Sequence, residues 1–196
     1  MKVAIIDYGS GNVFSVSSAL KRLGVDAVVT ANHDIIKSAN AVIFPGVGHA
    51  KFAMEQLREK GLDQLIPTLT QPVLGICLGM QLMCAVTEEG NVDCLNIFKD
   101  VQVKKFTNVP KIPHMGWNNL QNGKGLFQEV NADVYFVHSY YAELNQYTVS
   151  EAEYGSRFTA SMQMDNFYGC QFHPEKSGEN GEKIIGNFLK LIKLNN

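Results

Sequence analysis

Long apolar runs and an excess of positive charge are both missing from this 196-residue sequence. No uninterrupted apolar stretch approaches the roughly 18 residues that a membrane-spanning helix needs, so we expect no membrane partner. Lys and Arg number 17 against 19 Asp and Glu, a formal net charge of −2. Binding to a phosphate backbone requires a basic surface that this balance does not supply, so we expect no nucleic-acid partner.

Cysteine is scarce, and the spacing of the four cysteines excludes the common metal motifs. They are Cys77, Cys84, Cys94 and Cys170. None belongs to a CxxC pair or to a His and Cys set at zinc-ligand spacing, so we predict no metal. The glycine-containing segment 7–12 lacks the third glycine of a dinucleotide fingerprint and the lysine of a P-loop, so we predict no cofactor. Unpaired thiols and the absence of a secretory signal pattern predict a cytoplasmic location.

The first 90 residues alternate between short apolar segments and segments with apolar residues at helical spacing. The expected strands cover residues 3–7, 26–30, 41–44 and 73–77, and the expected helices cover residues 16–23, 52–60 and 78–86. We interpret His33 as a loop residue between two of these elements. Such alternation is typical of a parallel sheet with helices on both faces, whose binding sites lie at the carboxyl ends of the strands.

The second half has strand-like segments joined by short turns, followed by one amphipathic helix. The expected strands cover residues 101–106, 134–138, 147–152, 159–164 and 168–172, and the helix covers residues 182–194. We expect these strands to extend the sheet in antiparallel fashion. The prediction is an α/β, three-layer fold with a mixed, mainly parallel central sheet, formed by a single domain over residues 1–196.

Cys77 is the strongest candidate for a reactive residue. It ends an apolar segment, it has Gly75 and Gly79 two positions away on each side, and a helix is expected to follow. This pattern is typical of a strand that turns sharply into a helix and exposes a nucleophile at the turn. A buried cysteine after a strand is more often a small apolar core residue, so the interpretation depends on a matching base elsewhere.

His173 and Glu175 supply that base and a group to orient it. Pro174 disfavours a helix at His173, and in an extended segment residues two apart project to the same side. A nucleophilic thiol needs a nearby imidazole, and the imidazole needs a hydrogen-bond acceptor on its other nitrogen. Glu175 alone would fit an ordinary surface charge equally well, but beside His173 it completes a triad with Cys77.

Backbone N–H groups near Cys77 are candidates for an oxyanion hole. The N–H group of Leu78 directly follows the nucleophile, and the segment 45–48 follows another expected strand. Its glycines, Gly46 and Gly48, allow the backbone to approach a ligand closely. Two N–H donors aimed at a developing oxyanion are what acyl transfer requires.

Ordered motifs along the whole chain resemble one enzyme family. In order they are Asp7-Tyr-Gly-Ser-Gly-Asn12, Pro45-Gly-Val-Gly48, Gly75-Ile-Cys-Leu-Gly-Met-Gln81, Ile112-Pro-His-Met-Gly-Trp-Asn118, Tyr135-Phe-Val-His-Ser-Tyr-Tyr141 and Gln171-Phe-His-Pro-Glu-Lys-Ser177. The cysteine and histidine motifs resemble those of the class I, triad-type glutamine amidotransferases. The full set is similar to the glutaminase subunits of imidazole glycerol phosphate synthase.

The resemblance implies that Cys77 attacks the side-chain amide of glutamine and forms a glutamyl thioester. His173 would protonate the departing ammonia and later activate water, while Glu175 orients His173. The products would be glutamate and ammonia. Two further sets of family positions fall on this sequence: Val47, Gly48 and Leu78 around the oxyanion, and Gln81, Ser139 and Tyr140 near the bound glutamine.

A partner chain is expected because no segment remains to bind a second substrate that accepts ammonia. Free ammonia is largely protonated in neutral water, so it must pass to the acceptor through protein. The resemblance implies a heterodimer with a barrel-type cyclase, which forms imidazole glycerol phosphate and aminoimidazole carboxamide ribotide in histidine biosynthesis. Four residues match family positions at or near that interface or ammonia path: Asn12, Trp117, Tyr141 and Lys176.

The sequence also fits several alternative functions. The chain could be a related glutaminase that serves another synthase, for example in surface-sugar synthesis, or a non-catalytic binding subunit with the same fold. A cysteine hydrolase of similar architecture is a third possibility. For single residues, Trp117 fits a core position as well as a docking role, and His114 and His138 fit structural roles with satisfied hydrogen bonds.

Overall fold

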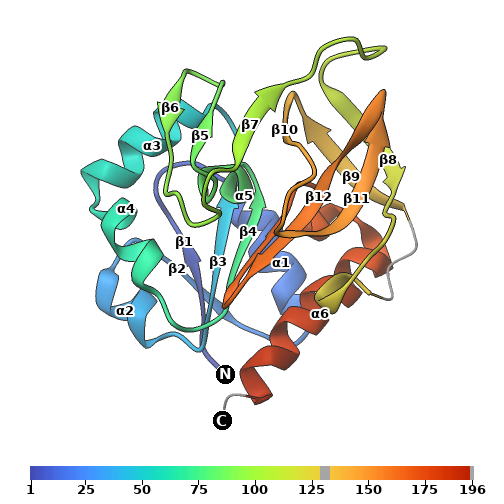
Figure 1. Ribbon diagram of the computed structural model, residues 1–196. Helices are drawn as coiled ribbons and strands as arrows, with labels where there is room; N and C mark the ends of the chain where they lie inside the picture. The colour runs from blue at the N-terminus through green and yellow to red at the C-terminus, as the bar shows by residue number, and fades with distance from the viewer. Residues whose placement is uncertain (129–132, 195–196) are drawn as a thin grey trace.

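The computed structural model describes residues 1–128 and 133–194 (Figure 1). The strands are β1 (Val3–Ile6), β2 (Ala27–Thr30), β3 (Ala41–Gly46), β4 (Val73–Cys77), β5 (Val86–Thr87), β6 (Val92–Asp93), β7 (Gln102–Lys105), β8 (His114–Asn119), β9 (Asp133–His138), β10 (Tyr140–Ala142), β11 (Thr148–Tyr154), β12 (Ser156–Met164) and β13 (Phe167–Cys170). The α-helices are α1 (Val13–Arg22), α2 (His33–Ser38), α3 (Ala50–Glu59), α4 (Leu62–Leu65), α5 (Leu78–Leu82) and α6 (Gly178–Leu194). The 3₁₀ turns are η1 (Ile66–Thr68), η2 (Gly125–Phe127) and η3 (Pro174–Lys176). The prediction of one domain over 1–196 also covers 129–132 and 195–196, which lie outside the described residues.

Within the described residues, the largest sheet has seven strands in the order β11-β12-β13-β4-β3-β1-β2. Strands β13, β4, β3, β1 and β2 run parallel to one another. Strands β12 and β11 add to one edge in antiparallel fashion. The sheet is therefore mixed and mainly parallel, which confirms the predicted fold class.

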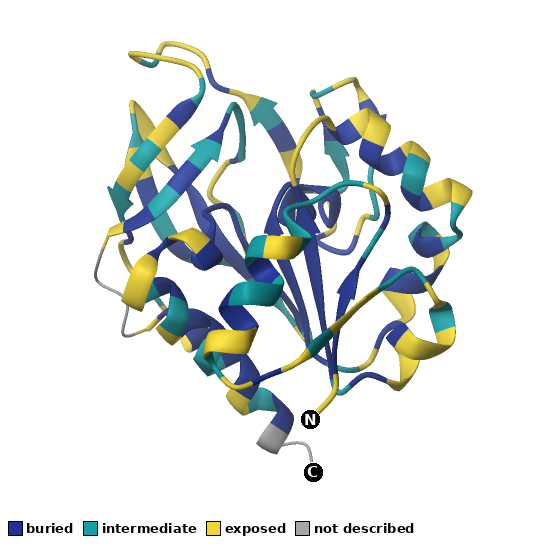
Figure 2. Cartoon of the chain, turned by 180° about the vertical axis from the view of Figure 1, so that it is seen from behind, coloured by how far each residue is buried: buried dark blue, intermediate teal, exposed yellow. Residues whose placement is uncertain are grey.

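Helices cover both faces of this sheet, because its central strands are apolar on both sides. In β1, Val3 and Ile5 pack into the apolar cluster beneath α1 and α6, whereas Ala4 and Ile6 pack into the cluster beneath α2, α3 and α4. Figure 2 shows the central strands as buried, between helices whose outer surfaces are exposed. A continuous apolar run, rather than an alternating one, is what a parallel strand buried on two faces requires.

The last helix follows the sequence prediction closely. In α6 the apolar stripe is buried: Ile184, Ile185, Phe188, Leu189 and Ile192. The structure starts the helix at Gly178, four residues before the expected start at residue 182. The first turn is polar and has no apolar periodicity, which is why the sequence pattern does not report it.

The helix after Cys77 is shorter than expected. It ends at Leu82 rather than near Val86, and Val86 belongs to strand β5. Backbone N–H groups from later residues occupy carbonyls near this end: Leu95 donates to Leu82, and Ile97 and Phe98 donate to Met83, each at 2.9 Å. Tertiary hydrogen bonds therefore end the helix where its sequence contains no breaker.

Two strands that we expected in the central sheet lie outside it. Strand β7 pairs with β10 and β5 in a four-stranded sheet, and β9 pairs with β8 in a two-stranded sheet. Strand β8 itself is not predicted from the sequence, because its inward-facing His114 is polar and its outward-facing Met115 and Trp117 are apolar. Apolar alternation identifies the buried face of a strand, so this reversed pattern hides β8.

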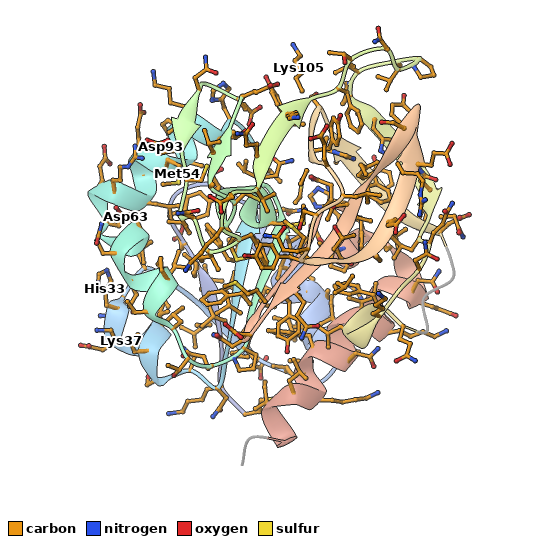
Figure 3. All side chains as sticks on the ribbon, in the orientation of Figure 1. His33, Lys37, Met54, Asp63, Asp93 and Lys105 are labelled. Atoms are coloured by element: carbon orange, nitrogen blue, oxygen red, sulfur yellow. The ribbon has the colours of Figure 1, made fainter. Side chains whose placement is uncertain are left out.

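The prediction that His33 lies in a loop is wrong, because His33 is the first residue of α2. The Asn32 side chain caps this helix by accepting hydrogen bonds from the Asp34 and Ile35 N–H groups at 2.9 and 3.1 Å. His33 is labelled in Figure 3, and its Nε2 atom lies 2.8 Å from the Lys60 carbonyl oxygen. Both contacts are structural and leave His33 outside the site described below.

Candidate active site

Cys77 lies at the carboxyl end of β4, where the chain turns directly into α5. Its backbone has a φ of 53° and a ψ of −109°, a conformation that residues with a side chain rarely adopt. Its neighbour across the sheet is Gly46 at the end of β3. Backbone strain of this kind persists where the surrounding structure enforces it, and it is characteristic of a nucleophile at a strand-to-helix turn.

The two glycines that flank Cys77 are needed for close packing. A methyl group added at Gly79 would overlap the carbonyl oxygen of Phe44 in β3. A methyl group at Gly75 would lie 2.9 Å from the backbone nitrogen of Met80. The unusual φ belongs to Cys77 itself, so the glycines allow α5 to pack directly on the sheet rather than supplying the turn conformation.

His173 and Glu175 form a buried pair. The Nδ1 atom of His173 lies 2.8 Å from Oε1 of Glu175, and both side chains are about 1% exposed. The backbone is extended at His173 but Glu175 lies in the 3₁₀ turn η3, so the expectation of a fully extended segment is wrong although the two side chains meet. The His173 N–H group donates to the Tyr135 carbonyl at 2.9 Å, and Ser177 Oγ donates to the His173 carbonyl at 2.6 Å. The bond to Tyr135 holds the His173 backbone against β9, and Glu175 orients the ring.

Electrostatic contacts with Cys77 and Glu175 favour a charged imidazole. Burial by itself lowers the pKa of His173, but the Cys77 sulfur and the Glu175 carboxylate outweigh burial and raise the pKa to about 10. The ring is then an imidazolium at neutral pH, paired on one side with Glu175. The Nδ1 atom is committed to Glu175, so Nε2 is the ring nitrogen left for the Cys77 side of the site.

A cavity of about 290 Å³ opens in front of Cys77 and His173. Its walls include all the residues predicted for the oxyanion hole and for glutamine binding: Val47, Gly48, Leu78, Gln81, Ser139 and Tyr140. The volume is close to the lower limit of roughly 300 Å³ for small-molecule sites, which suits a ligand the size of an amino acid. Glu175 does not line the cavity, because it lies behind His173.

The loop that carries Val47 and Gly48 is held by hydrogen bonds from the β1 side of the sheet. Ser10 Oγ donates to the Val47 carbonyl at 2.5 Å, and Tyr8 donates from its hydroxyl to the Pro45 carbonyl at 3.0 Å. Gly48 has a φ of 99°, which favours glycine. The loop conformation is therefore determined by contacts with the segment 7–12, the first motif in the sequence.

The four residues predicted for a partner interface lie outside the cavity. Trp117 is 57% exposed on β8, so the alternative that it fills the core is wrong. Asn12 caps α1 by accepting a hydrogen bond from the Ser15 N–H group. Tyr141 stacks on Phe106, with ring centroids 4.4 Å apart, and Lys176 is an exposed residue of η3.

Four residues line the cavity that the sequence did not single out for it: Glu89, Pro113, Val137 and His138. Glu89 adds a carboxylate, and its Oε2 atom accepts a hydrogen bond from the Ala50 N–H group at the start of α3, at 2.8 Å. The Val137 carbonyl lies 3.8 Å from the Cys77 sulfur. No local pattern distinguishes Glu89 from a surface acid, since Glu89 is brought here by the pairing of β5 with β6 and the packing of β6 against α3.

Within the described residues, no group of three or more His, Cys, Asp or Glu side chains is arranged to hold a metal ion. In the same part of the chain, none of the helices is both long and apolar enough to span a membrane.

Comparison with solved structures identifies the fold. A glutamine amidotransferase structure superposes with a TM-score of 0.77 at 18% identity and covers 97% of this chain and 98% of the other. A structure of PurLQS from Thermotoga maritima superposes with a TM-score of 0.68 at 17% identity and covers 96% of this chain and 97% of the other. At this level of identity, these likenesses concern the fold alone.

Sequence relatives identify the family. The model of the family "Glutamine amidotransferase class-I" matches residues 4–192. Two relatives are each named imidazole glycerol phosphate synthase subunit HisH. The one from Bacteroides fragilis is 56% identical to this chain, and the one from Escherichia coli is 49% identical. Both alignments cover 97% of this chain and 100% of the relative. The chain belongs to the class I glutamine amidotransferases and, within them, to the HisH subunits of imidazole glycerol phosphate synthase.

Proposed function

We propose that this chain hydrolyses L-glutamine to L-glutamate and ammonia as the glutaminase subunit of imidazole glycerol phosphate synthase. One observation carries the proposal: a strained Cys77 and a His173 held by Glu175 at 2.8 Å line the same cavity. The HisH relatives, which match over the whole of their length, support the assignment to this synthase. They also favour it over a glutaminase for another synthase.

The first half of the reaction forms a thioester. The Cys77 thiolate attacks the side-chain amide carbon of glutamine, and the carbonyl oxygen becomes an oxyanion. The N–H group of Leu78 and the backbone of Val47 and Gly48 stabilise this charge. His173, as an imidazolium, donates its Nε2 proton to the departing nitrogen, so the C–N bond breaks and neutral ammonia leaves.

The second half uses the neutral imidazole that the first half leaves behind. His173 takes a proton from water, and the resulting hydroxide attacks the thioester carbon. The C–S bond then breaks, glutamate leaves, and Cys77 and His173 return to the thiolate and imidazolium pair. Glu175 accepts the hydrogen bond from Nδ1 throughout, which fixes the ring and its tautomer.

The polar end of glutamine is proposed to bind opposite the thiol. Glu89 supplies a carboxylate for the α-ammonium group, and the Gln81 amide and the Ser139-Tyr140 segment supply hydrogen bonds. All four residues lie in the wall of the cavity, and among the described residues Glu89 is the only acid in that wall. The positive charge of the α-ammonium group and the negative charge of Glu89 are therefore complementary.

We further propose that ammonia passes to a barrel-type cyclase subunit, in a cytoplasmic heterodimer of the histidine-biosynthesis pathway. The names of the relatives, which describe each as a subunit, support the existence of a partner. Asn12, Trp117, Tyr141 and Lys176 are the proposed interface or ammonia-path residues. Trp117 and Met115, both more than half exposed on β8, give this face the apolar surface that docking favours.

The direct test is glutamate release by the purified chain together with the cyclase subunit encoded in the same genome. We expect Cys77→Ala to abolish release while glutamine binding and association of the two subunits remain. Cys84→Ala is the matched control, because Cys84 is also buried but lies in the apolar core, where its sulfur donates a hydrogen bond to the Met80 carbonyl. Turnover that survives in Cys77→Ala would refute the mechanism, and a wild-type complex without turnover would favour a non-catalytic subunit.

A further inference from the structure

Gln171 lies between the nucleophile and the glutamine-binding residue Gln81. It is fully buried, and its side-chain nitrogen lies 3.7 Å from the Cys77 sulfur. Its side-chain oxygen accepts a hydrogen bond from Gln81 Nε2 at 2.8 Å. The Gln171 backbone is anchored as well, because its N–H group donates to the Ala160 carbonyl at 2.8 Å.

The Tyr140 carbonyl determines which way these amides point. It lies 2.9 Å from Gln81 Nε2, and since a carbonyl oxygen can only accept, Gln81 must present its NH₂ group to it. The second hydrogen of that nitrogen points to Gln171, which must therefore present its oxygen. The Gln171 nitrogen is then the atom left to face the Cys77 sulfur.

The side-chain oxygen of Gln81 faces away from Tyr140 and Gln171. Both hydrogens on its nitrogen are committed, to Tyr140 and to Gln171, so its Oε1 atom is the one left to accept a hydrogen bond from a ligand. A flipped Gln81 amide would place two acceptors against each other at the Tyr140 carbonyl. Gln171 thus supports the amide orientation of Gln81 as well as contacting the sulfur.

We infer that Gln171 is a catalytic residue, whose side-chain N–H group donates to the Cys77 sulfur and stabilises it as a thiolate. This inference rests on the proposed function, because the thiolate is the form that attacks glutamine and the form that leaves when the thioester is hydrolysed. The sulfur loses its negative charge in the thioester, so the N–H donor favours both the start and the end of the cycle. Hydrogen bonds to a charged group are stronger than those between neutral groups.

The test is the rate of Cys77 alkylation by iodoacetamide, measured on the Cys77 peptide by mass spectrometry, together with kcat and KM for glutamine. Gln171→Glu keeps an oxygen for Gln81 but replaces the donor with an acceptor. We expect alkylation at pH 7 and kcat each to fall at least about tenfold, with KM within about threefold.

Gln171→Met is the second variant, because it removes the donor without burying a charge. Cys170→Ala is the matched control, since Cys170 is buried beside Gln171 and its sulfur contacts the Gly75 carbonyl. The control should alkylate at Cys77 at the wild-type rate. Wild-type alkylation in either Gln171 variant, with intact folding by circular dichroism, would overturn the inference.

Failure of the proposed function and failure of the role of Gln171 give different results. If the wild-type complex does not release glutamate, the proposed function is wrong, and the alkylation rates of the Gln171 variants still decide whether Gln171 supports the thiolate. If the wild type is active and Gln171→Glu has an unchanged kcat, the function stands and the role of Gln171 is refuted.

Discussion

The Nδ1 atom of His114 lies 3.0 Å from the Nε2 atom of His138, and both rings are buried. His138 Nδ1 lies 2.8 Å from the Tyr140 carbonyl, so Nδ1 carries the hydrogen and Nε2 accepts from His114. Burial lowers the pKa of His114 to about 4, and mainly burial lowers that of His138 to about 3. The pair is therefore neutral at pH 7 and joins β8, the proposed docking strand, to the backbone at Tyr140, in the proposed glutamine site.

This pair predicts a loss of stability in mild acid. In the unfolded chain both histidines take up protons below about pH 6.5, whereas the folded chain binds none until about pH 4. The stability that this pair contributes is therefore fully present above pH 6.5 and falls as the pH drops from 6.5 towards 4, by up to about 3 kcal/mol per pH unit for two groups. Urea unfolding at pH 7, 6 and 5 measures this slope.

The variant His114→Asn keeps a donor towards His138 and removes one of the two titrating groups. In this variant, the free energy of unfolding that is lost in mild acid should be about half of the loss in the wild type. An unchanged slope in His114→Asn would show that other groups, such as carboxylates, account for the acid sensitivity.

Glu89→Gln tests the proposed contact with the α-ammonium group of glutamine. The amide keeps an oxygen for the Ala50 N–H group but loses the negative charge in the cavity. We expect KM for glutamine to rise roughly 10- to 100-fold, because a hydrogen bond to a charged group is worth about 1.5–3 kcal/mol, while kcat changes little. Steady-state glutamate release over a range of glutamine concentrations separates the two constants.

Glu88→Gln is the control for Glu89, because the neighbouring carboxylate accepts a hydrogen bond from the Lys105 N–H group and does not line the catalytic cavity. Its KM should match the wild type. Equal KM values for Glu89→Gln and the wild type would place the ammonium group elsewhere.

Trp117→Ala tests the proposed docking face. Trp117 is 57% exposed on β8, and its ring makes an edge contact with Tyr135. Truncation of an exposed aromatic anchor should weaken association with the cyclase subunit roughly 10- to 100-fold, while the thermal stability of the isolated chain changes little. Isothermal titration of the two subunits gives the affinity.

Ile35→Ala is the matched control for Trp117. Ile35 is 42% exposed on α2, which lies at the other end of the sheet from β8 (Figure 1). The affinity of the Ile35→Ala variant for the cyclase subunit should equal that of the wild type. If Trp117→Ala also binds like the wild type, β8 does not carry the interface.

The parts of the structure that depend on local pattern could be predicted from the sequence. The strand and glycines around Cys77 and the apolar stripe of α6 each lie within about 17 consecutive residues. Pairing of His173 with Glu175 was also predictable, because the two residues are only two positions apart. The resemblance of the ordered motifs added the residues that line the cavity from segments 45–48 and 139–140.

The missed features depend on contacts between distant segments. Glu89 reaches the cavity through the N-terminus of α3, 39 residues earlier in the chain. Strand β8 places His114 inward and Trp117 outward, against the usual apolar rule, because His114 finds His138 as a buried partner. Likewise, the end of α5 depends on N–H groups from residues 95–98. Periodicity within a window cannot report any of these contacts.

Two glycine-to-alanine substitutions distinguish a glycine that is needed for close packing from one that only weakens a helix. Gly79→Ala would push a methyl group into the Phe44 carbonyl, so α5 must move away from the sheet, and we expect a loss of several kcal/mol with loss of activity. Gly186 lies inside α6, and beyond its chain neighbours and the backbone of its own helix a methyl group there meets no atom of the described residues within 4 Å. Gly186→Ala should therefore stabilise the protein by about 0.5–1 kcal/mol, since alanine favours the helix. Urea unfolding measures the change in the free energy of unfolding, which should be negative for Gly79→Ala and positive for Gly186→Ala. Destabilisation of both variants would mean that Gly186 also packs against a neighbour.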